Sequence, residues 1–251
     1  TTDELRTLHE GSPDGSFTWH LWRRLIEEGR WEEARSLEAA ARPTDDLVAH
    51  ARALEAAWSS LERSRAEFAS PEEQAEALYE WATAWYREGV REHGDMRELA
   101  SVMWCLSPQE REAVQVYLER SEPLVRARCL YREVADWFPD TAAAPNALYM
   151  VGLATFEMER CWEVLHCLGE RDLDVARAAF LELADKYPSS SLADDALYWA
   201  GTYARDGSMR QLFERLLRDH PEGDVARIVF PDGKPDLVQE RAEAFRERNE
   251  A

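Results

Sequence analysis

The sequence predicts an all-α protein whose helices form antiparallel pairs. Apolar residues recur at the spacing of amphipathic helices along most of the 251 residues. Helix-start and helix-stop signals separate these stretches, and no stretch shows the alternation of a β-strand. A helix–corner–helix unit also occurs twice, which is typical of proteins built from stacked repeats.

The first part of the chain predicts a leader followed by a helical region. Residues 1–16 contain the cluster Gly-Ser-Pro-Asp-Gly and predict a flexible leader. Residues 17–121 predict an N-terminal helical region with degenerate helix-pair repeats. The first pair, over 17–41, is divided at Gly29, and a long helix is expected over 45–68.

Two strong helix starts lie later in this region. Ser70 with Glu73, and Ser107 with Glu110, have the spacing of capping boxes, in which the serine and the glutamate bond to each other's backbone N–H. A proline follows each serine, at the first helical position where proline is favoured. We therefore expect helices that begin after Ser70 and Ser107, with a short helix over 97–106 between them.

The repeat block covers residues 122–230. Residues 127–152 align without a gap with residues 176–201, and about 11 of 26 positions are identical. In each copy the first helix ends at an X-Pro corner, because proline restricts the residue before it and cannot donate to the preceding turn. A third, weaker copy repeats the corner. The three corners are Phe138-Pro139, Tyr187-Pro188 and His220-Pro221.

The second copy makes two local predictions. Ser191, with Asp194 three residues later, predicts the N-cap of the following helix. Gly201 predicts a point where two helix backbones approach closely.

The copies are unevenly spaced, which indicates an insertion. The first two copies are offset by about 49 residues and the next two by about 33, so an insertion is expected at about 156–172. Its apolar side, with Trp162 and Leu165, either packs on its own stack or forms a partner surface. Residues 231–251 predict a C-terminal capping helix that covers the end of the stack.

The repeated unit is similar to the tetratricopeptide repeat (TPR). The resemblance rests on Ala and Phe in one helix, Tyr-Pro-Ser at the corner, and then Ala-Asp-Asp-Ala-Leu-Tyr-Trp-x-Gly, over about residues 125–227. It is nearest to repeats of bacterial envelope proteins, such as the TolA-binding coordinator and the outer-membrane assembly lipoproteins. The resemblance implies helix pairs stacked as a right-handed solenoid with a concave, peptide-binding face.

The resemblance also implies which residues line that face. Carried over by position, the expected partner-binding residues are Asn146, Tyr149, Leu153, Phe156, Asp195, Tyr198, Thr202 and Arg205. Tyr149 and Tyr198 are the main candidates, because tyrosine offers contact area and a hydroxyl at low entropic cost. The alternative is that both tyrosines only pack between repeats.

Composition narrows the class of partner. A formal net charge of −20 argues against nucleic acid or an anionic membrane as the main partner, since like charges repel. A basic peptide is compatible with that charge, although acidic side chains also serve simply as a solubilising surface. No apolar run is long enough to span a membrane. Most of the ten tryptophans are expected to pack between helices.

We find no catalytic, cofactor or metal motif in the sequence. Asp194 and Asp195 are interpreted as first-turn acids favoured by the helix dipole. His20 is expected to be a packed or surface histidine. The four cysteines are interpreted as buried thiols, with a longer-range disulfide of Cys129 left open.

These observations favour a non-enzymatic scaffold that binds a protein or peptide partner. A structural subunit of a larger envelope or secretion assembly is the second hypothesis, and an enzyme on a helical scaffold is the third. The resemblance favours the periplasm or cell envelope, whereas free thiols would favour the cytoplasm.

Overall fold

The computed structural model describes residues 2–11, 17–67, 69–91, 122–159, 174–204 and 207–229, together with residues 107, 109, 110, 112 and 116. Within these residues the protein contains helices and no strand, so the expected all-α class is confirmed. The helices are α1 (Thr2–Gly11), α2 (Thr18–Glu27), α3 (Trp31–Ala41), α4 (Asp45–Ala66), α5 (Pro71–Arg91), α8 (Pro123–Trp137), α9 (Ala143–Glu159), α11 (Asp174–Lys186), α12 (Ala193–Thr202), α13 (Met209–Asp219) and α14 (Asp224–Val229).

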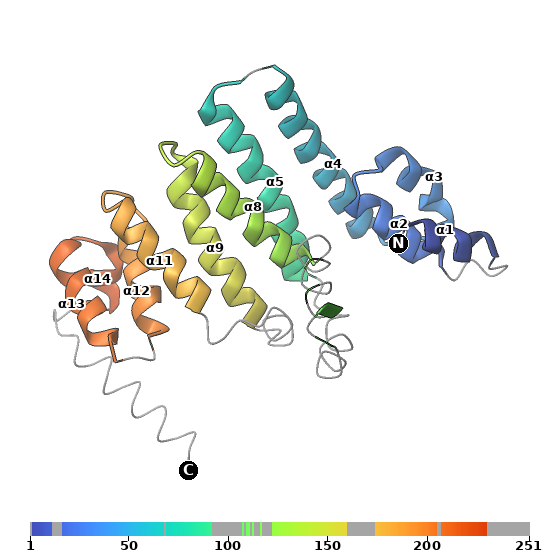
Figure 1. Cartoon of the computed structure of the whole chain (residues 1–251). Coiled ribbons are helices and arrows are strands. Elements are labelled where there is room, and N and C mark those ends of the chain that lie inside the picture. The colour runs from blue at the N-terminus through green and yellow to red at the C-terminus, as the bar shows by residue number, and fades with distance from the viewer. Residues whose placement is uncertain are drawn as a thin grey trace, which may run out of the picture.

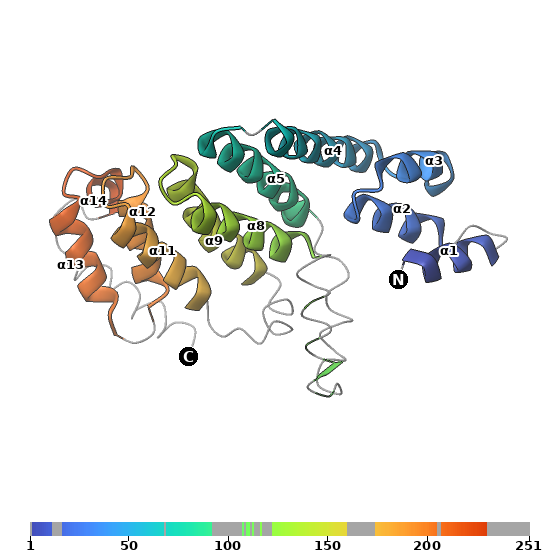
Figure 2. The same ribbon diagram turned by 45° about the horizontal axis from the view of Figure 1, so that its top comes forward.

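The helices form an elongated row in which each packs on its neighbours. Figures 1 and 2 show α1 to α3 at one end, then α4, α5, α8, α9 and α11, with α12 to α14 at the other end. Direct packing links α4 to α5, α5 to α8, α8 to α9, α9 to α11, α11 to α12 and α12 to α13. In addition, α5 contacts α9 and α12 contacts α14. Helices that do not follow each other directly in the row, such as α5 and α9, therefore also contact each other.

The three proline corners have the same structure. The residue before each proline donates its N–H to the carbonyl four residues back, at 3.0 Å for Phe138, 2.8 Å for Tyr187 and 2.8 Å for His220. The carbonyl of the same residue then accepts from the N–H three residues on, at 3.1, 2.9 and 3.0 Å respectively. Because the weak third copy has the same bonds as the other two, its expected corner is confirmed.

The capping boxes are also confirmed. The Ser70 N–H donates to Glu73 Oε2 at 2.8 Å, and the Glu73 N–H donates to Ser70 Oγ at 3.3 Å. Ser107 and Glu110 exchange the same bonds at 2.7 and 3.3 Å. The Ser191 prediction is wrong, because α12 has Leu192 as its N-cap residue, with no side-chain cap.

The N-terminal segment differs from the expected leader. Thr2–Gly11 forms α1, and polar contacts tie this helix to the next two. The Thr2 hydroxyl donates to Glu28, and Arg6 Nη2 lies 2.6 Å from Glu33 Oε2. The glycine and proline cluster begins at Gly11, the last residue of α1, and its other residues lie outside the described part of the chain. The break at Gly29 is confirmed, since Gly29 has a φ of +71° between α2 and α3.

Glycines make room for aromatic rings in the repeat block. A Cβ on Gly201 of α12 would lie 2.6 Å from Cε1 of Phe213 on α13, and a Cβ on Gly152 of α9 would collide with the ring of Phe180 on α11. The predicted close approach at Gly201 is therefore one between a helix and a ring, not between two helix backbones. Phe180 and Phe213 are buried as a result.

Most tryptophans described by the structure pack between helices, but one does not. Trp22, Trp81 and Trp85 are each at most 3% exposed, whereas Trp137 at the end of α8 is 60% exposed. No helix among the described residues is long and apolar enough to cross a membrane. The expected helix over 97–106, the insertion at about 156–172 beyond the end of α9, and the capping helix in 231–251 lie outside the described residues.

Candidate functional site: an aromatic face and a junction pocket

Three helices, α5, α9 and α12, present equivalent tyrosines to one face of the row. Each tyrosine follows an Ala-Leu pair whose side chains are buried, so the tyrosine lies at the edge of the core. The half-buried tyrosine then packs against a ring on a helix that its own helix contacts in the row. The ring pairs are Tyr79 with Tyr131 at 5.2 Å, Tyr149 with Phe180 at 5.5 Å and Tyr198 with Phe213 at 6.0 Å between centroids.

A cluster of rings joins α9 to α12. The indole N–H of Trp199 donates a hydrogen bond to the Tyr149 hydroxyl at 3.1 Å. The Phe156 ring lies 6.1 Å from Trp199 and 5.7 Å from Tyr203, and the Trp199 and Tyr203 rings stack at 5.8 Å. All four side chains are half-buried, so the cluster both holds the two helices together and keeps ring surface open to a partner.

We call this surface the aromatic face. It consists of the half-buried rings of Tyr79, Tyr86, Tyr149, Phe156, Tyr198, Trp199 and Tyr203.

The other expected partner-binding residues take different positions. Asn146 and Thr202 are exposed, and each donates to a carbonyl of its own helix, Asn146 to Ala142 at 3.4 Å and Thr202 to Tyr198 at 2.9 Å. Leu153 is half-buried and packs against the core. Arg205, Trp162 and Leu165 lie outside the described residues.

Carboxylates surround the tyrosines of the aromatic face. Burial raises the pKa of the Tyr79 hydroxyl, and the charges of Glu80 and Glu76 raise it further. Burial and Glu157 raise the pKa of Tyr86 in the same way. Burial raises the pKa of Tyr149, and the hydrogen bond from Trp199 lowers it by a smaller amount. The charges of Asp195 and Asp194 add to the increase. The field over this face is therefore negative.

The contribution of α5 to this face was missed in the sequence. The signal was present, because Ala77-Leu78-Tyr79 repeats the Ala-Leu-Tyr of residues 147–149 and 196–198. No X-Pro corner precedes Tyr79 at the spacing found before Tyr149 and Tyr198. Residues 92–121 also separate α5 from α8, which carries the ring partner Tyr131. Alignment of adjacent copies therefore identifies no copy of the repeat before residue 122.

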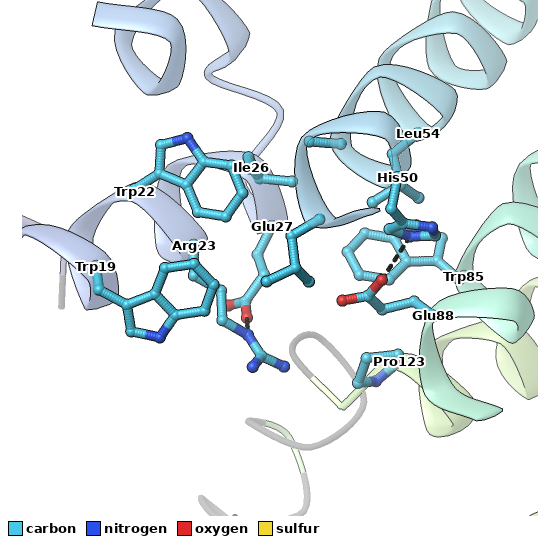
Figure 3. Close-up of a pocket in the computed structure, with 12 residues that line it drawn as sticks. Trp19, Trp22, Arg23, Ile26, Glu27, His50, Leu54, Trp85, Glu88 and Pro123 are labelled. Carbon is cyan, nitrogen blue, oxygen red and sulfur yellow. Dashed lines mark hydrogen bonds and ion pairs between the residues drawn. The ribbon is translucent and has the colours of Figure 1, made fainter. Parts of the chain in front are cut away.

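A second candidate site is a pocket where α2 meets α4, α5 and the start of α8 (Figure 3). The free volume inside it is about 30 Å³, which is room for one or two water molecules and is far below that of a ligand-binding pocket. Its walls are mainly apolar and include three tryptophans. The lining residues are Trp19, Trp22, Arg23, Ile26, Glu27, Leu47, His50, Ala51, Leu54, Trp85, Glu88 and Pro123.

The polar groups of this junction pocket contact one another. His50 Nε2 lies 2.8 Å from Glu88 Oε2, and their side chains are 8% and 12% exposed. The two atoms are close enough for an ion pair, but they do not have the geometry of a hydrogen bond. Arg23 Nε lies 3.4 Å from Glu27 Oε1, and burial raises the pKa of Glu27 despite the opposing charges of Arg23 and Arg24.

Arg126 of α8 contacts two of the residues that line the pocket, Trp85 and Glu27. Its guanidinium lies 4.2 Å from the centroid of the Trp85 ring, a cation–π contact, and its Nη1 donates to the Glu27 carbonyl at 2.9 Å. Burial lowers the pKa of Arg126 to about 10. The Trp85 indole N–H has no acceptor within the described part of the chain.

The described lining of the pocket contains two acidic and two basic side chains, Glu27, Glu88, Arg23 and His50. No Ser, Thr, Cys or Lys belongs to its described lining, so it offers no nucleophile beside His50. Its acids are each engaged with a nearby base. Sequence reasoning missed it because His50 and Glu88 belong to no motif and meet only through the packing of α4 on α5.

Comparisons with known proteins give no relative of this chain: no family model matches, and no curated protein or solved structure gives a significant match.

Proposed function

We propose that the protein is a non-enzymatic scaffold in which TPR-like helix pairs, stacked as a solenoid, bind a basic protein or peptide through the aromatic face. The observation that carries the proposal is the alignment of α5, α9 and α12, whose half-buried rings lie among carboxylates. Rings offer contact area at low entropic cost, and the negative field favours lysine and arginine side chains.

The charge of the face can be tested without disturbing its packing. Glu76 and Glu80 are exposed, form no described ion pair, and act on Tyr79. A double substitution Glu76→Lys/Glu80→Lys should weaken binding of an arginine- and lysine-rich peptide library by about tenfold, because it places two positive charges beside the docking surface. Fluorescence anisotropy of the labelled peptides would measure this loss.

A matched control lies on the neighbouring helix. Glu62 of α4 and Glu67, which directly follows α4, are also exposed, and Glu62→Lys/Glu67→Lys changes the net charge by the same amount away from the face. This variant should bind as the wild type does, apart from a small long-range effect. Equal losses in both variants would mean that only the net charge attracts the peptides, and the aromatic face would lose its assigned role.

A structural subunit of a larger envelope or secretion assembly is the second proposal, and Trp137 supports it. An indole that is 60% exposed at a corner is costly in water and is typical of protein contacts. Sedimentation of the purified chain, with Trp137→Ser as the comparison, tests this reading. The proposal would be contradicted if the wild type stays monomeric at every concentration and the Trp137→Ser variant binds the same partners as the wild type.

A further inference from the structure

One arginine of the chain shows how this fold holds a guanidinium group. The Arg126 guanidinium lies 4.2 Å from the centroid of the Trp85 ring and 5.6 Å from that of Trp81. Its Nη1 also donates a hydrogen bond to the carbonyl oxygen of Glu27 at 2.9 Å. The contact therefore combines the face of an aromatic ring with an oxygen that accepts from the guanidinium N–H groups.

The same two components, a ring and an oxygen acceptor, recur on the aromatic face at α5 and α12. Glu76 precedes Ala77-Leu78-Tyr79, and Asp195 precedes Ala196-Leu197-Tyr198, so the two acids occupy equivalent positions. Residues three apart on a helix are neighbours, with about 5–6 Å between their Cβ atoms. Each acid therefore lies one turn before a half-buried tyrosine. The equivalent residue of α9, Asn146, is neutral.

Both acids are available to a partner. Glu76 is exposed and Asp195 is half-buried, and neither forms a hydrogen bond or an ion pair within the described part of the chain. Asp194 and Asp224 lie close to Asp195, so they add negative charge there and do not neutralise it. A cation that reaches either acid therefore meets a carboxylate and, one turn away, an aromatic ring.

On α12 this site includes a second ring. Asp195 lies four residues before Trp199, whose ring stacks on that of Tyr203 at 5.8 Å. The Trp199 N–H is already donated to the Tyr149 hydroxyl, so a partner meets the indole ring and not its N–H. Indole is the side-chain ring that attracts a cation most strongly.

A guanidinium group fits these pairs of acid and ring better than an ammonium group does. Its planar fork donates two parallel N–H bonds to a carboxylate, and its weakly hydrated face stacks on a ring. The lysine ammonium is a compact, strongly hydrated point charge, so it gains mainly from the negative field. We propose that the aromatic face selects arginine over lysine side chains of its partner, with Glu76 and Asp195 as the acceptors. This inference rests on the proposed function, because it specifies the partner of the same face.

Two labelled peptides that differ only in having arginine or lysine at the same positions test this selectivity. Fluorescence anisotropy with the full chain at low ionic strength would measure both affinities. The arginine peptide should bind at least about fivefold more tightly than the lysine peptide. Equal affinities would overturn the selectivity and leave the proposed function intact. If neither peptide binds, both the proposed function and this inference are contradicted.

The two acceptors are tested by Glu76→Gln/Asp195→Asn, which removes both charges and nearly keeps the side-chain shapes. The ratio of the two affinities should fall towards one in this variant. Its matched control, Glu67→Gln/Asp174→Asn, removes the same charge from two exposed acids that have no aromatic residue three or four positions away. The control should keep the wild-type ratio, and circular dichroism checks that both variants are folded. Equal ratios in the two variants would overturn the assignment of Glu76 and Asp195.

Discussion

The indole N–H of Trp199 donates a hydrogen bond to the hydroxyl of Tyr149 across 3.1 Å, and this bond fixes α12 against α9. The two helices are separated in sequence by α11, so the bond joins equivalent helices of successive repeats. Trp199 also packs against Phe156, which places the polar link at the edge of a ring cluster. Tyr149 thus has a structural role through its hydroxyl, and its half-buried ring has a surface that a partner can reach.

Tyr149→Phe separates these two roles. The substitution keeps the ring against Phe180 but removes the acceptor of the Trp199 N–H. We expect the free energy of unfolding to fall by about 0.5–1.5 kcal/mol. Binding of a basic peptide should change little if the ring is the contact. Urea denaturation and the anisotropy titration would measure both, and a large loss of affinity at unchanged stability would assign the contact to the hydroxyl.

Gly152→Ala should destabilise the repeat block. A Cβ at this position would collide with the ring of Phe180, which is fully buried. Overpacking of this kind costs about 1–3 kcal/mol, which exceeds the gain in helix propensity of about 1 kcal/mol. Thermal and urea unfolding would measure the change.

Asn146→Ala on the same helix is the control for this prediction, because Asn146 is exposed and makes one weak hydrogen bond. Its effect should stay within about 0.5 kcal/mol. A Gly152→Ala protein as stable as the wild type would mean that the helices can separate without cost at this point.

Much of the helical structure could be predicted, because its signals are local. Capping boxes such as Ser70-Glu73 and corners such as Tyr187-Pro188 act through neighbouring residues, and both were found where expected. Ser191 failed as a cap because α12 begins at Ala193, one residue later than a cap at Ser191 requires. The neighbouring Ser190 accepts the Leu192 N–H at 3.2 Å instead.

The candidate sites were harder to predict, because their residues meet only in the folded chain. Tyr149 was identified through the repeat, but its bond to Trp199 depends on the packing of α9 beside α12. Tyr79 was missed because long intervening segments hide a repeat in the sequence without altering the packing of its helices. Asp224 has no sequence relationship with Asp194, and only the position of α14 brings them together.

Glu122 should make stability depend on pH. It is buried at the start of α8, where its carboxylate accepts the Val125 N–H at 2.6 Å. Burial raises its pKa to about 7. The N–H groups of Val125 and Leu124 and the charges of Arg23 and Arg128 act in the opposite direction and lower the pKa, but by less. The folded state therefore binds the proton more tightly than the unfolded state, whose carboxyl titrates near 4.5. Stability from this group is full below about pH 4.5 and is lost as the pH rises to about 7.

Glu122→Gln tests this dependence, since glutamine keeps a carbonyl acceptor and does not titrate. The free energy of unfolding of the wild type should fall by about 1–3 kcal/mol relative to the variant between pH 5 and pH 8. Urea denaturation at a series of pH values would measure both proteins. Parallel curves across this range would show that Glu122 titrates normally in the folded protein.

Arg132 and Glu182 should be energetically coupled, because they link α8 to α11. Arg132 Nη1 lies 2.5 Å from Glu182 Oε2, and Arg132 Nη2 lies 2.9 Å from Asp136 Oδ1. Partial burial alone would raise the pKa of Glu182, but hydrogen bonds from Arg132 and Lys186 lower it. The stabilisation is therefore present above the unfolded pKa near 4.5 and is lost as the pH falls through the lower folded pKa.

A double-mutant cycle with Arg132→Gln and Glu182→Gln should give a coupling of about 0.5–1 kcal/mol at pH 7, somewhat above that of an exposed pair. The coupling should shrink in about 1 M salt, where the Debye length is about 3 Å, and approach zero once Glu182 is protonated in acid. Arg210 and Glu214, an exposed pair on one helix at 3.2 Å, provide the control with a smaller expected coupling. Equal couplings for the two pairs would mean that contact between repeats adds nothing to the ion pair, and the link between α8 and α11 would then rest on apolar packing alone.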